Sequence, residues 1–123
     1  MKNEQLSKLS DTALVDRFRD CGLQQEEALL DSDTAKYNKL FDKMEAIDTE
    51  LRARGPEARR ALLTLLDHDS PRVRHAAAVR SLAIAPERSL ATIKEIASSH
   101  LMPEAGRAGM TLYHLEQGIF KPT

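Results

Sequence analysis

The side chains best suited to chemistry are four histidines and one cysteine. His68, His75, His100 and His114 show no His-x-x-x-His spacing, which would place two metal ligands on one helical face. Cys21 lies on an apolar stripe with no local base, and this position predicts a buried, inert thiol. We therefore expect no catalytic residue, no metal site and no cofactor.

The acidic residues also lack a catalytic arrangement. Glu26 and Glu27 are adjacent, and Asp48 and Glu50 are two residues apart, so neither pair converges on one helical face. The segment 31–33 has two aspartates but lacks the further oxygen ligands and the turn glycine of a calcium loop. With no glycine-rich phosphate loop and no recognisable Ser/His/Asp arrangement, the sequence predicts a protein that is not an enzyme.

Arginine is the functional side chain that is most concentrated in this sequence. A guanidinium group suits bidentate recognition of carboxylate or phosphate, so the arginines of the middle segment are candidates for a ridge that faces a partner. The alternative is a solvated face that nearby acids neutralise. The arginines are Arg52, Arg54, Arg59, Arg60, Arg72, Arg74, Arg80 and Arg88, and the acids are Glu57, Asp67, Asp69 and Glu87.

Length and composition predict one soluble domain over residues 1–123. The chain is 41% hydrophobic and 30% charged, only 4% of its residues are aromatic, and Trp is absent. This balance favours close-packed helices over strands. A single cysteine excludes an internal disulfide, and neither a signal-like region nor an apolar run of about 20 residues is present. We therefore expect a cytoplasmic protein without a membrane segment.

Charge is divided unevenly along the chain. The net charge of −1 gives no general attraction for nucleic acid or anionic lipid. Residues 1–55 carry 9 basic and 12 acidic side chains, whereas residues 56–123 carry 9 basic and 7 acidic ones. The second half is therefore the basic half.

Apolar residues recur at the three-four spacing of helical faces through most of the chain. Ser10 and Asp33 stand at N-cap positions, Gly55 stands at a helix end, and four prolines stand at helix starts. The pattern predicts an all-α protein. Its expected parts are a helical hairpin over 12–54, two helix pairs over 56–118 with starts at Pro56, Pro71, Pro86 and Pro103, and a tail over 119–123.

The two helix pairs form a weak internal repeat with a period of about thirty residues. Two unrelated hairpins with similar punctuation are the alternative. The stretch 65–77 resembles the HEAT-repeat signature, in which paired leucines end one helix and Val-Arg-x-x-Ala-Ala opens the next. Asp69 is expected to cap this second helix and to lie within reach of Arg74. The signature residues are Leu66, Asp69, Val73, Arg74, Ala76 and Ala77.

Over nearly its whole length the chain resembles a small bacterial family catalogued as a domain of unknown function, number two-thousand-and-nineteen. The resemblance implies a HEAT-like, armadillo-type helical fold, and it brings no established activity to any residue. The likeness is carried by 65–77 and by the segments Asn38–Asp42, Glu50–Arg59, Ala85–Arg88 and Glu116–Pro122.

These observations predict a non-catalytic module that binds a cognate protein, with a regulatory or immunity-type inhibitor as one concrete form. We expect its contact surface on the basic half, at Arg72, His75 and Arg107, and a partner with an acidic patch. The alternative is a nucleic-acid-binding helical repeat that uses the arginine-rich half. Near-neutral charge and the lack of Trp and of stacking aromatics on the basic half disfavour it.

Overall fold

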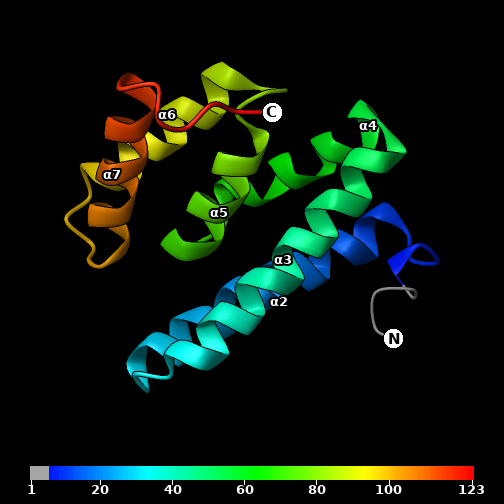
Figure 1. Ribbon diagram of the computed structural model, residues 1–123, viewed down its shortest axis with the longest axis horizontal. Coiled ribbons are helices and arrows are strands. Elements are labelled where there is room, and N and C mark those ends of the chain that lie inside the picture. The colour runs from blue at the N-terminus through cyan, green and yellow to red at the C-terminus, as the bar shows by residue number, and fades with distance from the viewer. Residues whose placement is uncertain (1–5) are drawn as a thin grey trace. The chain divides into compact units, whose positions relative to one another are not determined.

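Helices make up all the regular structure of the computed structural model, which describes residues 6–123 (Figure 1). Within those residues there are six α-helices, one 3-10 helix and no strand. The prediction of an all-α protein is confirmed. The chain divides into two compact units, Met1–Leu62 and Leu63–Thr123, which are described separately below. A single domain over 1–123 and a HEAT-like repeat stay predictions.

Unit 1 is built on a hairpin of two long helices, α2 (Asp11–Leu30) and α3 (Thr34–Arg54) (Figure 1). The Ser10 hydroxyl accepts a hydrogen bond from the Ala13 N–H at 3.0 Å, so the predicted cap of α2 is present. The Asp33 carboxylate caps α3 through the Lys36 N–H, also at 3.0 Å. Both helices therefore begin where the sequence placed them.

The predicted apolar stripes of α2 and α3 form the core of unit 1. Leu14, Phe18, Met44 and Leu51 are fully buried there. The three-four spacing of the apolar residues of α3 places Phe41 on its inward face, but the Phe41 side chain is 41% exposed. At the end of α3, Gly55 has a φ of 115°, which other residues rarely adopt, so glycine is required for the turn into the next helix.

The helix expected to begin at Pro56 differs in kind from the prediction. It consists of a short α-helix, α4 (Pro56–Arg60), followed by a 3-10 helix, η1 (Ala61–Asp67). A 3-10 helix has three residues per turn, so residues three apart lie directly above one another. Leu62 aligns with Leu65 and Leu63 with Leu66, and all four leucines are buried. The tighter winding thus buries two adjacent leucine rows.

Unit 2 packs three helices together: α5 (Pro71–Ser81), α6 (Pro86–Ala97) and α7 (Glu104–Glu116). Small side chains at the contacts let the helix backbones approach closely. Branched residues from α5 and α6 fill the remaining space. The fully buried apolar residues of these helices are Val73, Ala76, Ala77, Ala78, Ile93, Ile96 and Ala108. None of the helices in residues 6–123 combines the length and the apolar character that a bilayer crossing requires.

The cap of α5 corrects one detail of the sequence prediction. The Ser70 hydroxyl, not the Asp69 carboxylate, accepts a hydrogen bond from the Val73 N–H at 3.2 Å. Arg74 does not pair with Asp69 but donates to the Leu66 carbonyl at 3.0 Å and pairs with Glu95. Arg74 therefore ties the end of η1 to α5 and α6.

The fully buried methyl group of Ala77 on α5 generates a stability prediction. Ala77→Leu should lower the free energy of unfolding by about 1–3 kcal/mol, because the added carbons have no space between the packed helices. Urea melts followed by circular dichroism measure the change. Ala53→Leu, at an exposed position of α3, is the matched control and should melt like the wild type. An Ala77 variant as stable as this control would show that the contact around Ala77 is loose.

Candidate functional site

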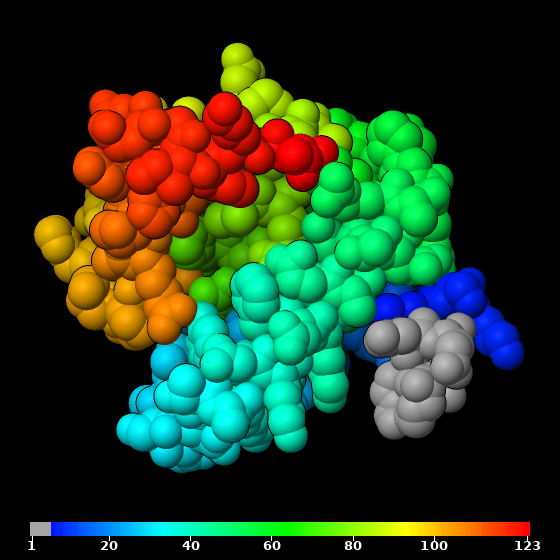
Figure 2. Space-filling model, in the orientation of Figure 1, coloured from blue at the N-terminus to red at the C-terminus, as the bar shows by residue number. Residues whose placement is uncertain are grey.

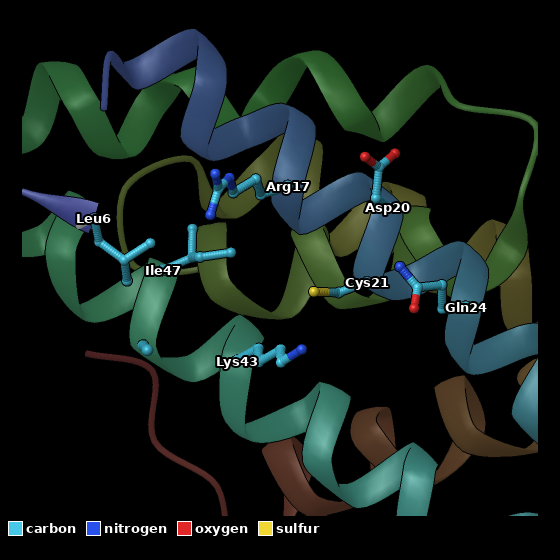
Figure 3. A pocket seen from close by; sticks show the side chains of 8 residues that line it. Leu6, Arg17, Asp20, Cys21, Gln24, Lys43 and Ile47 are labelled. Atoms are coloured by element: carbon cyan, nitrogen blue, oxygen red, sulfur yellow. The ribbon is translucent and has the colours of Figure 1, made fainter. Parts of the chain in front are cut away.

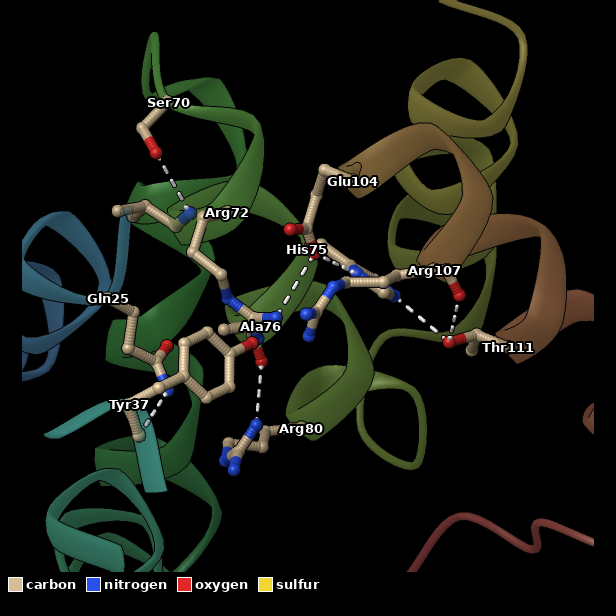
Figure 4. A network of polar contacts seen from close by, with 11 residues as sticks. Gln25, Tyr37, Ser70, Arg72, His75, Ala76, Arg80, Glu104, Arg107 and Thr111 are labelled. Atoms are coloured by element: carbon tan, nitrogen blue, oxygen red, sulfur yellow. Dashed lines mark hydrogen bonds and ion pairs between the residues drawn. The ribbon is translucent and has the colours of Figure 1, made fainter. Parts of the chain in front are cut away.

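A buried polar cluster joins α5 to the first turn of α7 (Figure 4). The Glu104 Oε2 atom accepts a hydrogen bond from Arg72 Nη1 at 3.1 Å and lies 2.6 Å from His75 Nδ1. The side chains of Arg72, His75 and Glu104 are 9%, 6% and 5% exposed. Arg72 and His75 are three residues apart on α5 and so share one helical face. One carboxylate therefore receives two side chains from the facing helix.

The imidazole of His75 continues this network to a hydroxyl group. A carboxylate oxygen can only accept, so the hydrogen between His75 and Glu104 belongs to Nδ1. On the other side of the ring, His75 Nε2 lies 3.0 Å from Thr111 Oγ1, which is itself 3.1 Å from the Arg107 carbonyl oxygen. The cluster thus runs from α5 through His75 to the middle of α7.

The order hydroxyl, imidazole and carboxylate is the order of a nucleophilic triad, which the sequence spacing did not reveal. Two contacts favour a structural role. The Thr111 hydroxyl bonds to the carbonyl four residues earlier, which is the usual behaviour of a helical threonine. Arg72 also bonds to the Glu104 oxygen that His75 contacts, and this cation offsets the charge that would stabilise an imidazolium. We interpret the cluster as a bridge between helices.

The structure brings the three predicted partner-binding residues to the same side of unit 2, but it does not expose them equally. Arg72 and His75 are buried and turned toward Glu104. Arg107 is half-buried on α7, and its carbonyl accepts the Thr111 hydroxyl. A direct contact of these residues with a partner stays a prediction, and the two on α5 have a structural role.

Three further arginines of the middle segment, Arg54, Arg74 and Arg88, lie near acids, mostly not those suggested by the sequence. In unit 1, Arg54 bonds Glu50 and Asp11, each at 2.9 Å, and donates to the Leu6 carbonyl at 2.9 Å. The side-chain hydrogen bonds raise the pKa of Arg54, and the bond with Glu50 has a larger effect than the bond with Asp11. Of the four acids suggested, Asp67 is seen near an arginine, at 3.9 Å from Arg88.

The histidines and the cysteine lie in ordinary structural positions. His68 Nδ1 accepts the Ser70 N–H at 2.9 Å, so this ring helps to shape the turn before α5. Among residues 6–123, no group of three His, Cys, Asp or Glu side chains could hold a metal ion. Cys21 is buried, and this burial raises the pKa of its thiol. A raised pKa keeps the thiol protonated at neutral pH.

An open groove lies between α6 and α7, in a place that the sequence pattern assigned to the core. Its volume is about 570 Å3, and Leu112 and Leu115 on its α7 wall are only half-buried. Tyr113 is 52% exposed, as is the neighbouring Met110. Figure 2 shows that side chains of α7, coloured orange, form part of the surface of unit 2. The groove is lined by Leu90, Lys94, Gly109, Leu112, Tyr113, Leu115 and Glu116.

A family profile described as a domain of unknown function, DUF2019, matches residues 12–116. The chain belongs to this family. The DUF2019 chain is also similar to a solved structure, described as the crystal structure of the protein RPA1889 from Rhodopseudomonas palustris CGA009. The two share 38% sequence identity over 96% of this chain and 98% of that one, with a TM-score of 0.92. No curated protein matches the sequence. The solved structure thus shares the fold of this chain, and neither comparison assigns an activity to it.

The buried carboxylate of Glu104 predicts a strong dependence of stability on its cationic neighbours. In this DUF2019 protein, Glu104→Leu should lower the free energy of unfolding by about 3–5 kcal/mol, because it leaves the Arg72 charge buried without its carboxylate. Chemical denaturation of Glu104→Leu, of Arg72→Met and of the double variant Arg72→Met/Glu104→Leu measures the coupling. The double variant should recover part of the loss. If the double variant were less stable by the sum of the two single losses, Arg72 and Glu104 would not stabilise each other.

Proposed function

We propose that this DUF2019 protein is a non-catalytic protein-binding module whose contact surface is the α6–α7 groove. The observation that carries the proposal is the groove itself, which leaves large apolar side chains of a terminal helix open to solvent. Tyrosine and methionine are enriched at protein interfaces, and Tyr113 and Met110 are both half-exposed on α7. Exposed apolar surface of this kind is typical of a docking site.

The charges on the groove define the chemistry of the partner. Lys94 is exposed on the α6 side and forms no ion pair within residues 6–123. An acidic side chain of the partner would therefore meet a cation that is not already held in an internal ion pair. The partner that fits is a protein with an apolar anchor for the groove and an acidic group placed for Lys94. The sequence suggested an acidic patch on the partner, and the groove requires one acidic group of that patch to lie opposite Lys94.

The biological role of this binding is inferred by analogy with similar proteins. The chain resembles small bacterial helical-repeat proteins, and such proteins commonly bind and block or regulate another protein. A regulatory or immunity-type inhibitor is accordingly the form of the module that we favour. The half-open terminal helix pair supports binding by surface contact, because its lining offers apolar contact area.

Nucleic-acid binding is the competing function. The exposure of Tyr113 favours nucleic-acid binding, because its half-exposed ring on the basic half could stack on a base. The charge disfavours it, since the chain has a net charge of −1 and the groove presents one lysine, whereas nucleic-acid binding relies on contacts of several basic side chains with phosphates. In an electrophoretic shift assay at several salt concentrations, we expect no salt-dependent complex with single- or double-stranded DNA or with RNA. A complex that weakens steeply with salt would favour the nucleic-acid function instead.

Groove variants test the protein-binding function. Affinity capture from the native host with the wild type, with Tyr113→Ala and with Lys94→Glu should recover one partner whose yield falls in both variants. Losing a half-exposed interface tyrosine typically weakens binding about 10-fold or more, because its ring no longer fills the partner's contact. Charge reversal at Lys94 should act mainly by slowing association. Binding to the purified partner then gives the affinities.

The matched control removes apolar surface from another place. Leu23→Ala/Leu30→Ala changes two exposed leucines of α2 and should bind the partner like the wild type. Circular dichroism establishes that every variant is folded. If the yield of captured partner fell equally in the control and in the groove variants, non-specific apolar adhesion would explain the capture. If the groove variants kept full affinity for the partner, the groove would not be its binding site.

A further inference from the structure

A small cavity in unit 1 lies between facing turns of α2 and α3 (Figure 3). Its volume is about 250 Å3, which suits a ligand smaller than most drugs and cofactors. The lining residues of α2 are spaced 0, 3, 4 and 7 positions along the helix, so they share one face. They are Arg17, Asp20, Cys21 and Gln24, and the remaining lining is Leu6, Lys43, Ala46 and Ile47.

The charges around the cavity do not balance. Arg17 comes from α2 and Lys43 from α3, and neither side chain forms an ion pair within residues 6–123. Asp20 also lines the cavity, but its Oδ1 accepts hydrogen bonds from Arg19 at 3.2 and 3.1 Å. Two cations without acidic partners therefore border a space whose one carboxylate is shared with Arg19.

Both cations act on the interior of the cavity. Burial raises the pKa of the Cys21 thiol most strongly, while Lys43 lowers it, Asp20 raises it and Arg17 lowers it through their charges. In Figure 3 the Cys21 sulfur lies to one side of Arg17 and Lys43, and Ile47 and Leu6 lie to the other side. The cavity thus has an apolar wall and two positive side chains at its edge.

We propose that this cavity binds a small organic anion with an apolar body, such as a medium-chain carboxylate. The apolar body would lie against Leu6, Ile47 and the thiol of Cys21, and the anionic group would lie between Arg17 and Lys43. An anion there reduces the repulsion between two like charges that otherwise face the same space. The site lies in unit 1 and is independent of the groove proposed for protein binding.

The first experiment uses octanoate as the probe, with octanol and acetate as its neutral and tail-free controls. Octanoate should give saturable NMR shifts at amides of α2 and α3 around the cavity. It should also slow alkylation of Cys21 by N-ethylmaleimide, a clean readout because the chain has one cysteine. Octanol and acetate should bind more weakly, since each lacks one of the two contacts.

Variants locate the site and identify the charge. Arg17→Gln/Lys43→Gln should weaken octanoate binding about tenfold, as expected for two partly exposed ion pairs. Arg52→Gln/Arg60→Gln removes the same charge from exposed positions of unit 1 and should bind octanoate like the wild type. Ala46→Leu places extra carbons in the cavity and should block both the shifts and the protection of Cys21.

Three results would overturn the proposal. Shifts that fail to saturate, or that spread over both units, would show that octanoate does not occupy one site. Equal binding of octanol and octanoate, with full affinity in the Arg17/Lys43 variant, would show that the cavity does not select an anion. Unchanged binding in a folded Ala46→Leu protein would place the ligand elsewhere. None of these outcomes bears on the α6–α7 groove.

Discussion

The buried carboxylate of Glu104 is the constraint on which the arrangement of unit 2 depends. An ionised carboxylate is costly to bury unless hydrogen bonds and opposite charges surround it. Arg72 and His75 meet this requirement from one face of α5, at 3.1 and 2.6 Å. Glu104 is also the first residue of α7, where the helix dipole favours a negative charge. The start of α7 is therefore held against α5 by polar contacts that apolar packing could not specify.

The remaining geometry of α7 follows from this attachment. Ala105, directly after Glu104, and Ala108, one turn further along, are buried, and their small side chains permit close contact with the neighbouring helices. Leu112 and Leu115 continue this face at the three-four spacing but are only half-buried, and together with Tyr113 they form the wall of the groove with α6. The polar bridge therefore holds the first turn of α7, and the groove opens further along the same helix.

The sequence predicted the helix boundaries well because they depend on local chemistry. Ser10, Asp33 and Gly55 act within a few residues of their position, so their roles are visible in the sequence. Local chemistry did not decide between α-helical and 3-10 winding at 61–67, since the leucine pattern there fits either period. Ser70 and Asp69 are likewise adjacent residues that can both cap a helix, and only the backbone path selects Ser70.

The candidate sites were harder to predict, because they depend on pairs that are distant in the sequence. Arg72 and Glu104 are separated by 32 positions, and nothing local indicates that these two charges meet. The charge division between the halves and the expected repeat led to Arg72 and His75 as contact residues, and neither feature reveals which side chains have an internal partner. In the fold, an internal partner removes a charged side chain from the surface that a ligand meets. The charges best placed for recognition are then those without such a partner, Lys94 at the groove and Arg17 with Lys43 at the cavity.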